Sequence, residues 1–245
     1  MWPICVDDIA GVLAALLQCH HLRYEFQARY NIAPTQIAPV TRTGDHGECE
    51  LVGMRWGLIP SWAKDRSFGS RMINARSETA VEKPAFRSAF KRRRCLVPAS
   101  GFFEWKKVGT GKRPQKQPYY IYRADEQPLV MAGLWESWNG PEAGEPTETY
   151  TILTTDANDQ VRDLHDRMPA ILEPDQFDAW LNPRQDDAEA LTSLLRPAPD
   201  GVLAMHAVST RVNSPKHDDS TVIEQSTVSS DEETGTYGRS LFDTK

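Results

Sequence analysis

The spacing of apolar residues predicts one N-terminal helix followed by a series of short strands. Apolar residues recur at intervals of three and four from Ile9 to Leu17, behind Asp7 and Asp8, which indicates an amphipathic helix over residues 7–18. Seven later runs have the composition of strands and are separated by turn residues. They are Glu50–Trp56, Cys95–Pro98, Phe102–Lys106, Tyr119–Arg123, Pro128–Trp135, Tyr150–Thr154 and Val202–Ser209. The pattern predicts a single-domain α+β fold, in which a mainly antiparallel sheet curls into an open barrel with peripheral helices.

Three further segments complete this prediction. Glycines between Lys107 and Pro118 join two strand-like flanks, so a β-hairpin is expected there. Helical spacing over Pro174–Leu181 and Asp186–Leu195 predicts two short helices that cover the sheet. From about Ser226 the chain is acidic and lacks apolar periodicity, so residues 1–225 are predicted to form the domain and residues 226–245 a disordered tail.

Composition is that of an ordinary globular protein. The 245 residues are 40% hydrophobic and 25% charged, enough for a substantial core. No apolar run approaches the roughly 18 residues of a membrane span, and the first residues lack the basic start of a secretory signal. We expect a soluble, monomeric cytoplasmic protein without a membrane partner, associated with the nucleoid if its host is bacterial. The cysteines have no metal-ligand spacing, so no metal or other cofactor is predicted, and Cys95 is predicted to be buried.

Positive charge is concentrated in the middle of the chain. The whole sequence has a net charge of -6, yet residues 62–123 contain 16 Lys and Arg against 4 Asp and Glu, a local net charge of +12. An anion-binding face on an acidic body is the simplest interpretation, and nucleic acid is the expected partner. A solvated basic surface is the alternative, particularly for Lys91–Arg94, which could be one exposed helix end.

Glu104 is a candidate for acid/base chemistry. It lies in a predicted strand in which alternation places Phe102 and Glu104 on one face and Phe103 and Trp105 on the other. Partial burial of a carboxylate beside aromatic surface would raise its pKa and make it a proton donor or acceptor near neutral pH. The alternative is an outward-facing Glu104 paired with a lysine such as Lys106.

His165 is the histidine best placed for proton transfer. It lies between Leu164 and Asp166 and close to Arg167. A neighbouring carboxylate could orient the imidazole ring while one ring nitrogen serves as acid or base. A purely structural histidine is the alternative.

Four other residues are candidates for binding. Asn74 offers both a donor and an acceptor, which could hold an amine or a sugar oxygen, whereas an asparagine that caps a turn is the alternative. Arg76 and Arg167 suit phosphate, because a guanidinium presents a fork of donors to its oxygens. Trp62 could stack on an unpaired base, with a core position as the alternative.

Six polar motifs follow one another in a defined order along the chain. They are Arg29–Gln36, Trp56–Trp62, Met72–Thr79, Gly101–Lys106, Leu164–Pro169 and Val208–Asn213. In this order the chain resembles the SOS response-associated peptidase (SRAP) family from about Arg29 to about Gln225.

The resemblance implies a DNA-damage protein that recognises abasic sites in single-stranded DNA. Members of that family cross-link to the lesion through an N-terminal cysteine, whose amine and thiol form a thiazolidine with the ring-opened sugar. The resemblance gives Asn74, Glu104 and His165 the catalytic roles of orienting the terminus, assisting ring opening and moving protons. A thiol peptidase, which the family's name suggests, and a noncatalytic single-strand binder are the alternatives.

The start of the chain departs from the family pattern. It reads Met1-Trp2-Pro3-Ile4-Cys5, so no cysteine directly follows the initiator Met. A start that replaces the authentic one, a cleavage that exposes Cys5, and a member that binds without cross-linking are three explanations. We favour the first, because the predicted helix over 7–18 and all six motifs stand where the family has them.

Overall fold

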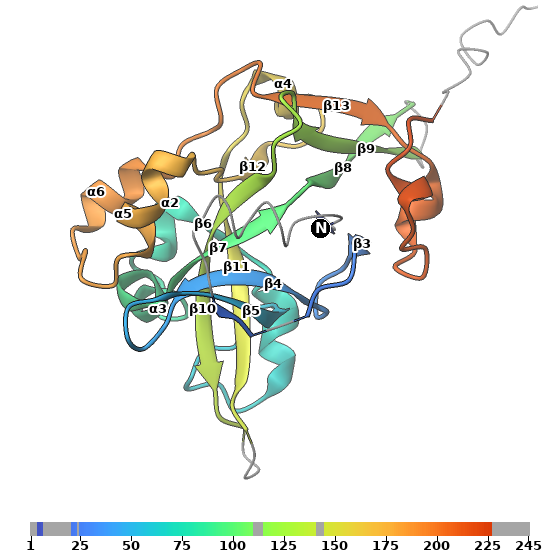
Figure 1. Ribbon diagram of the computed structural model, residues 1–245. Coiled ribbons are helices and arrows are strands. Elements are labelled where there is room, and N and C mark those ends of the chain that lie inside the picture. The colour runs from blue at the N-terminus through green and yellow to red at the C-terminus, as the bar shows by residue number, and fades with distance from the viewer. Residues whose placement is uncertain (1–3, 7–20, 24, 110–114, 141–144, 227–245) are drawn as a thin grey trace, which may run out of the picture.

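The fold consists of two β-sheets and several short helices (Figure 1). The structure is a computed structural model that describes residues 4–6, 21–23, 25–109, 115–140 and 145–226. The predicted helix over 7–18 lies outside the described residues, as does the predicted acidic tail from residue 227 onward. The proposed domain boundary near 225 therefore stays a prediction.

The larger sheet contains a closed barrel. Its strand order is β12 (Arg167–Pro169), β11 (Thr147–Asp156), β10 (Leu129–Trp138), β7 (Arg94–Ala99), β4 (Ile37–Thr43), β5 (Cys49–Trp56) and β2 (His21–Leu22). A parallel pairing between β5 and β11, with Arg55 opposite Thr149 and Trp56 opposite Tyr150, joins the next-to-last strand of this path to the second one. Because β11, β10, β7, β4 and β5 then form a ring, the barrel is closed, whereas the sequence predicted an open one.

The smaller sheet carries the candidate site. Its order is β13 (Leu203–Ala207), β9 (Gln115–Arg123), β8 (Gly101–Val108), β1 (Ile4–Val6) and β3 (Arg29–Ile32), with every pair antiparallel. Only Ser100 separates β7 of the barrel from β8 of the smaller sheet. The site is therefore attached directly to the rigid barrel.

Short helices cover the barrel. In Figure 1, α2 (Ser77–Ala80), α3 (Arg87–Arg92), α5 (Phe177–Leu181) and α6 (Ala188–Ser193) gather on one side. Phe90 of α3 and Trp180 of α5 meet edge to face, with ring centroids 5.8 Å apart. The short strand β6 (Asn74–Arg76) precedes α2 and pairs in parallel with β11. Remaining turns include η1 (Arg66–Arg71), α4 (Asp159–Arg162), η2 (Pro174–Gln176), η3 (Thr210–Asn213) and η4 (Ser220–Val222).

Large apolar side chains fill the barrel. Trp56 stacks on Tyr150 with ring centroids 6.1 Å apart, and both side chains are fully buried. Cys95 belongs to the same cluster, which confirms its prediction as a buried small side chain. Burial among apolar groups raises the pKa of the Cys95 thiol far above its ordinary value, so this thiol is inert.

Arg94 fastens the helical cover to the barrel. Its side chain is buried, and its guanidinium donates to the carbonyl oxygens of Trp180, Phe90, Lys91, Asn182 and Gln185. Burial lowers the pKa of Arg94 to about 10. The predicted basic run therefore divides: Arg94 is an internal anchor, and Arg93 pairs with Glu136 at 2.7 Å.

The sequence predictions of fold and elements are confirmed for most of the chain. All seven predicted strands are present, at β5, β7, β8, β9, β10, β11 and β13. The predicted hairpin is confirmed by the pairing of Val108 with Gln115, and the helices predicted over 174–181 and 186–195 correspond to η2 with α5 and to α6. The strands β1, β2, β3, β4, β6 and β12 were not predicted.

Candidate functional site

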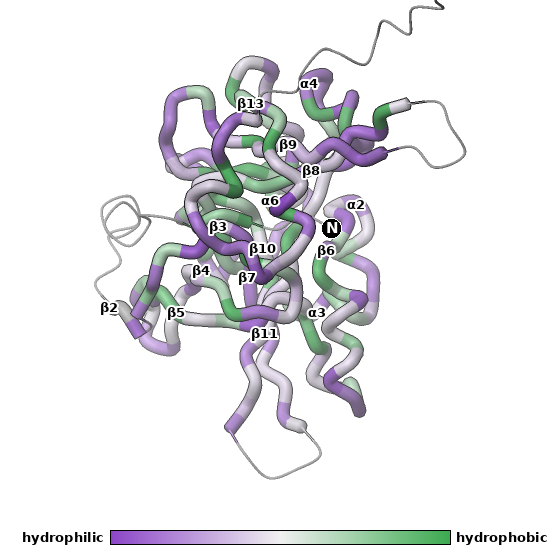
Figure 2. Tube along the Cα trace, turned by 90° about the vertical axis from the view of Figure 1, so that its right-hand side faces the viewer, coloured by the Kyte–Doolittle hydropathy of each residue, from purple (hydrophilic) through white to green (hydrophobic). Residues whose placement is uncertain are grey.

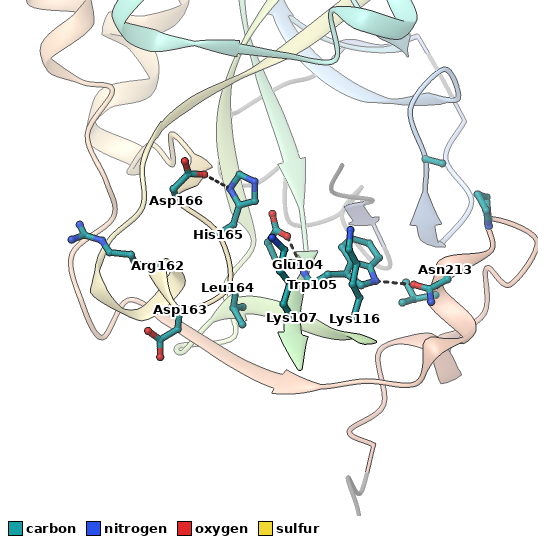
Figure 3. A pocket seen from close by; sticks show the side chains of 13 residues that line it. Glu104, Trp105, Lys107, Lys116, Arg162, Asp163, Leu164, His165, Asp166 and Asn213 are labelled. Atoms are coloured by element: carbon teal, nitrogen blue, oxygen red, sulfur yellow. Dashed lines mark hydrogen bonds and ion pairs between the residues drawn. The ribbon is translucent and has the colours of Figure 1, made fainter. Parts of the chain in front are cut away.

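A cavity of about 830 Å³ opens beside β8 and brings the two acid/base candidates together (Figure 3). Glu104 and Trp105 of β8 lie between the His165 turn on one side and Asn213 at the end of η3 on the other. Lys107 and Lys116 of the β8–β9 hairpin also line the cavity. The wall thus combines a carboxylate, an imidazole, an indole and ammonium groups.

Glu104 is buried on the face of β8 that it shares with Phe102. Phe102 on its face packs in the barrel core, whereas Phe103 and Trp105 join a separate cluster on the other face. The Glu104 residue is only 3% exposed, which excludes the outward-facing alternative. Its Oε2 accepts a hydrogen bond from the backbone N–H of Trp105 at 2.8 Å. Its Oε1 is buried and has no hydrogen-bond partner among the described residues.

The protonation equilibrium of Glu104 is matched to neutral pH. Burial raises the pKa of Glu104 to about 7, against the opposing effects of the Trp105 N–H and the positive charge of Lys116. A carboxyl group with a pKa near 7 exists in both forms at neutral pH. It can therefore donate or accept a proton in the cavity.

His165 follows a short, capped turn. Asn158 accepts a hydrogen bond from Val161 N–H at the start of α4, and His165 N–H donates to the Val161 carbonyl at 3.0 Å. The His165 Nδ1 lies 3.0 Å from the backbone N of Arg167 and 3.1 Å from Oδ1 of Asp166. These two contacts suit different placements of the ring hydrogen, because an Nδ1 without hydrogen accepts from the Arg167 N–H, whereas an Nδ1–H donates to Asp166.

Both placements of the His165 ring hydrogen are therefore supported by the same turn. The ring is partly exposed to the cavity and Asp166 is largely exposed, so the ion pair is weak. The predicted orientation of the imidazole by the neighbouring carboxylate agrees with this geometry. Its catalytic role stays a prediction.

Asn74 and Arg76 lie on β6, outside the residues that line the cavity. Asn74 pairs with Ile152 of β11, and its Oδ1 is buried without a hydrogen-bond partner among the described residues. Arg76 is exposed, while Ala75 between them is buried.

Arg167 has an internal role in this structure. Its guanidinium binds both carboxylate oxygens of Glu78, at 2.8 and 3.0 Å, and also Asp156 at 2.7 Å. It donates to the carbonyl of Thr154 as well, at 2.6 Å. These contacts fix β12, and with it the His165 turn, against α2 and β11. A phosphate would have to compete with two carboxylates, so the predicted phosphate-binding role gains no support from the contacts.

Trp62 lies on the surface rather than in the core. It is 57% exposed, its ring meets Phe68 edge to face at 5.6 Å, and the Arg71 guanidinium lies over the Phe68 ring at 5.1 Å. The segment that contains Trp62 and Phe68 lies close to the barrel because the backbones of Gly57 and Gly69 are in contact. Gly57 has a φ of 117°, and a Cβ at this position would lie 2.4 Å from the Gly69 carbonyl oxygen. The buried alternative for Trp62 is thus wrong.

The wall opposite His165 was not predicted. Trp105 Nε1 donates to Asn213 Oδ1 at 2.7 Å, which holds the indole against η3. Both residues belong to motifs that the sequence singled out, but their roles could not be assigned there. The contact joins positions 108 residues apart, so no local pattern announces it.

Two polar residues, the buried Asn31 and the half-buried Asp218, hold this wall in place. The Asn31 amide donates to the carbonyls of Val212, Ser214 and His217, at 3.0, 3.1 and 2.9 Å. Asp218 accepts from the backbone N–H groups of Tyr30 and Asn31, each at 2.7 Å, and from the Arg29 side chain. The segment after η3 is therefore bound to β3 from both directions.

The described cysteines stand apart from the cavity. Cys5 is buried in the cluster around Phe103, Cys95 is inside the barrel, and Cys49 lies at the start of β5; none of the three lines the cavity. Within the described residues, no group of three or more His, Cys, Asp or Glu is arranged to hold a metal ion. In the same part of the chain, no helix is long and apolar enough to cross a membrane.

Comparison with known proteins places the chain in a family. Residues 7–215 match the family model described as SOS response associated peptidase (SRAP). The chain is 43% identical over 200 residues to abasic site processing protein YoqW of Bacillus subtilis, covering 82% of this chain and 87% of that protein. It is 36% identical to abasic site processing protein HMCES of Gallus gallus, covering 79% and 65%.

Solved structures agree with this assignment. A protein from Bacteroides thetaiotaomicron superimposes with a TM-score of 0.80 at 29% identity, covering 92% of this chain and 99% of that one. A phage-related protein from Bordetella bronchiseptica gives a TM-score of 0.68 at 29% identity, covering 86% and 95%. The resemblance of the six motifs is thereby confirmed, and the chain belongs to the SOS response associated peptidase (SRAP) family.

Proposed function

We propose that this protein processes abasic sites in single-stranded DNA and that the Glu104 cavity is where the baseless sugar reacts. The observation that carries the proposal is the buried Glu104 carboxyl, with a pKa of about 7, facing a cavity shared with His165. Membership of the family and relatives that are named abasic site processing proteins support the choice of substrate.

The chemistry of an abasic site requires such a pair. The sugar is mostly a closed hemiacetal, and its aldehyde forms when the C1′ hydroxyl loses a proton and the ring oxygen gains one. Glu104 and His165 can supply one donor and one acceptor across the cavity, and the roles reverse when the ring closes. Each proton then returns to its starting group over a full cycle, so no cofactor is needed.

Covalent capture is the second part of the proposal. An amine and a thiol on the same residue condense with the aldehyde, releasing one water, to form a thiazolidine. β1 runs antiparallel to β8, with Ile4 opposite Phe102 and Cys5 opposite Gly101, so its N-terminal end points along β8 toward Glu104. We propose that the nucleophile precedes β1 in the sequence and reacts at this site. This step requires a cysteine whose own amine is the N-terminal amine.

Recognition of the strand is assigned to exposed groups outside the cavity lining. Trp62 presents an indole on which an unpaired base can stack, and Arg76 presents a free-standing guanidinium on the surface. We propose that both contact the strand. Asn74 is proposed to act on the sugar or on the chain terminus through its buried, unpartnered Oδ1.

A denaturing gel tests the proposal. The protein is incubated with an abasic and an intact oligonucleotide of the same sequence, and we expect a product only from the abasic strand. Trp2→Cys, which creates an N-terminal cysteine once Met1 is removed, is expected to convert that product into a covalent protein–DNA band. Glu104→Gln is measured in the same assay and is expected to slow the reaction. Glu82→Gln, a substitution of the same kind at an exposed position, is its control.

Two outcomes would contradict the proposal. Equal behaviour of the abasic and intact strands with both forms of the chain would exclude abasic-site processing. Cleavage of peptides without any reaction of the abasic strand would favour the peptidase that the family description names. None of the described cysteines lines the cavity, so a thiol peptidase using Cys5 and His165 has no support from the geometry.

A further inference from the structure

Two lysines face each other at the mouth of the Glu104 cavity. Lys107 of β8 lies directly opposite Lys116 of β9 in the antiparallel register, so both side chains stand on the same face of the hairpin. Both are exposed, and both line the cavity. Figure 2 shows β8 and β9 becoming hydrophilic toward this outer end.

The arrangement is unfavourable unless an anion is present. Directly opposed like charges destabilise a strand pair. No carboxylate of the described residues forms an ion pair with either ammonium group, although other cations of the molecule are paired in this way. The nearby Lys106 differs, because it stands opposite Gln117 and does not line the cavity.

Charge within the cavity is unevenly distributed. The far wall contains Arg162, but Asp163 and Asp166 lie beside it and offset its charge. The hairpin wall carries the two lysines, and Glu104, which is buried, is the only acidic group that the described residues place beside them. An anionic group that enters the cavity is therefore attracted to the hairpin side.

We propose that Lys107 and Lys116 together bind a backbone phosphate of the DNA strand next to the sugar that occupies the Glu104 cavity. This inference rests on the proposed function for the identity of the strand, but the phosphate contact applies equally to a strand without a lesion. The two ammonium groups share one phosphate as point charges, and the phosphate relieves their mutual repulsion. Arg76 and Trp62 would contact the strand elsewhere.

Phosphate binding here would also act on Glu104. The positive charge of Lys116 lowers the pKa of Glu104, against the larger effect of burial. A phosphate that neutralises Lys116 weakens this lowering, so Glu104 holds its proton more firmly when the strand is bound. Lys116 therefore couples strand binding to the protonation of the carboxyl that acts on the sugar.

The test uses a double variant that combines Lys107→Gln with Lys116→Gln. Lys106→Gln, which removes a charge from the same hairpin outside the cavity, is the control. Affinity for an intact single-stranded oligonucleotide is measured between about 50 and 200 mM salt. Loss of both Lys107 and Lys116 should reduce the slope of log affinity against log salt by about 1, while Lys106→Gln leaves it nearly unchanged. The affinity of the double variant should fall about tenfold near 100 mM salt.

A double variant whose slope and affinity equal those of Lys106→Gln would overturn the inference. The abasic reaction is measured separately with the same proteins. If the double variant has a reduced salt slope but the parent protein does not react with the abasic strand, the proposed function is wrong and the phosphate site is supported. If the parent protein reacts with the abasic strand but the double variant has an unaltered salt slope, the proposed function is supported and the phosphate site is wrong.

Discussion

Replacement of Glu104 by Gln should stabilise the protein at alkaline pH while it removes activity. The pKa of Glu104 is raised in the fold to about 7 from an ordinary value of 4.5. A raised pKa means that the folded state prefers the protonated carboxyl. The stabilising contribution is therefore complete below pH 4.5 and is lost as the pH rises through 7.

The size of the effect follows from the two pKa values. At 1.36 kcal/mol for each pKa unit, the interval from 4.5 to about 7 corresponds to about 3 kcal/mol. Solvent screens the charge of Glu104 only weakly, because this residue is only 3% exposed. Gln resembles the protonated carboxyl in shape and keeps an acceptor for the Trp105 N–H. We therefore expect Glu104→Gln to raise the free energy of unfolding by up to about 3 kcal/mol at pH 8 and by about zero at pH 4.5.

Urea unfolding at both pH values measures this difference. The slope with urea should be the same for both proteins, so the change appears in the midpoint. Glu82→Gln, an exposed control, should show no such dependence on pH. If Glu104→Gln shifts the midpoint equally at pH 4.5 and 8, or lowers it at pH 8, the argument that burial strains the ionised carboxyl is wrong.

Three further substitutions test the surrounding framework. Arg94→Met removes a buried guanidinium that serves five carbonyls, so the free energy of unfolding should drop by about 3 to 5 kcal/mol; an unchanged urea midpoint would refute the anchor. Asp218→Asn should cost about 2 kcal/mol by the same measurement, because it weakens hydrogen bonds to Arg29, Tyr30 and Asn31. Asn213→Leu removes the acceptor of the Trp105 Nε1–H bond, so it should slow abasic processing while it changes stability by only about 1 kcal/mol. Unaltered kinetics would show that this bond does not contribute to the reaction.

The part of the site on one strand was predictable from the sequence. Side chains alternate along any strand, so the placement of Glu104 on the same face as Phe102 followed from local spacing, whereas its burial was one of two alternatives that the structure decided. The His165 turn was predictable for the same reason, since its partners Asp166 and Arg167 are close in sequence. In both cases the residues that set the chemistry are near neighbours in the chain.

Contacts between distant segments could not be predicted in this way. The bond between Asp218 and the Asn31 N–H spans 187 residues, and no periodic pattern links these positions. Closure of the barrel depends on a parallel pairing of β5 with β11, which alternation alone does not specify. β4 was missed because Pro39 interrupts its pattern, yet Pro39 lies opposite Gly53 inside the barrel sheet.

The central claim is that Glu104 and His165 move protons on a baseless sugar. Single-turnover processing of an abasic oligonucleotide by the Trp2→Cys chain, followed from pH 5 to 9 beside its affinity for the strand, tests this claim most directly. The rate should change near pH 7, and Glu104→Gln or His165→Gln should lower it by about 10²- to 10⁴-fold with affinity nearly unchanged. Equal rates for the parent and both variants at every pH would contradict the account.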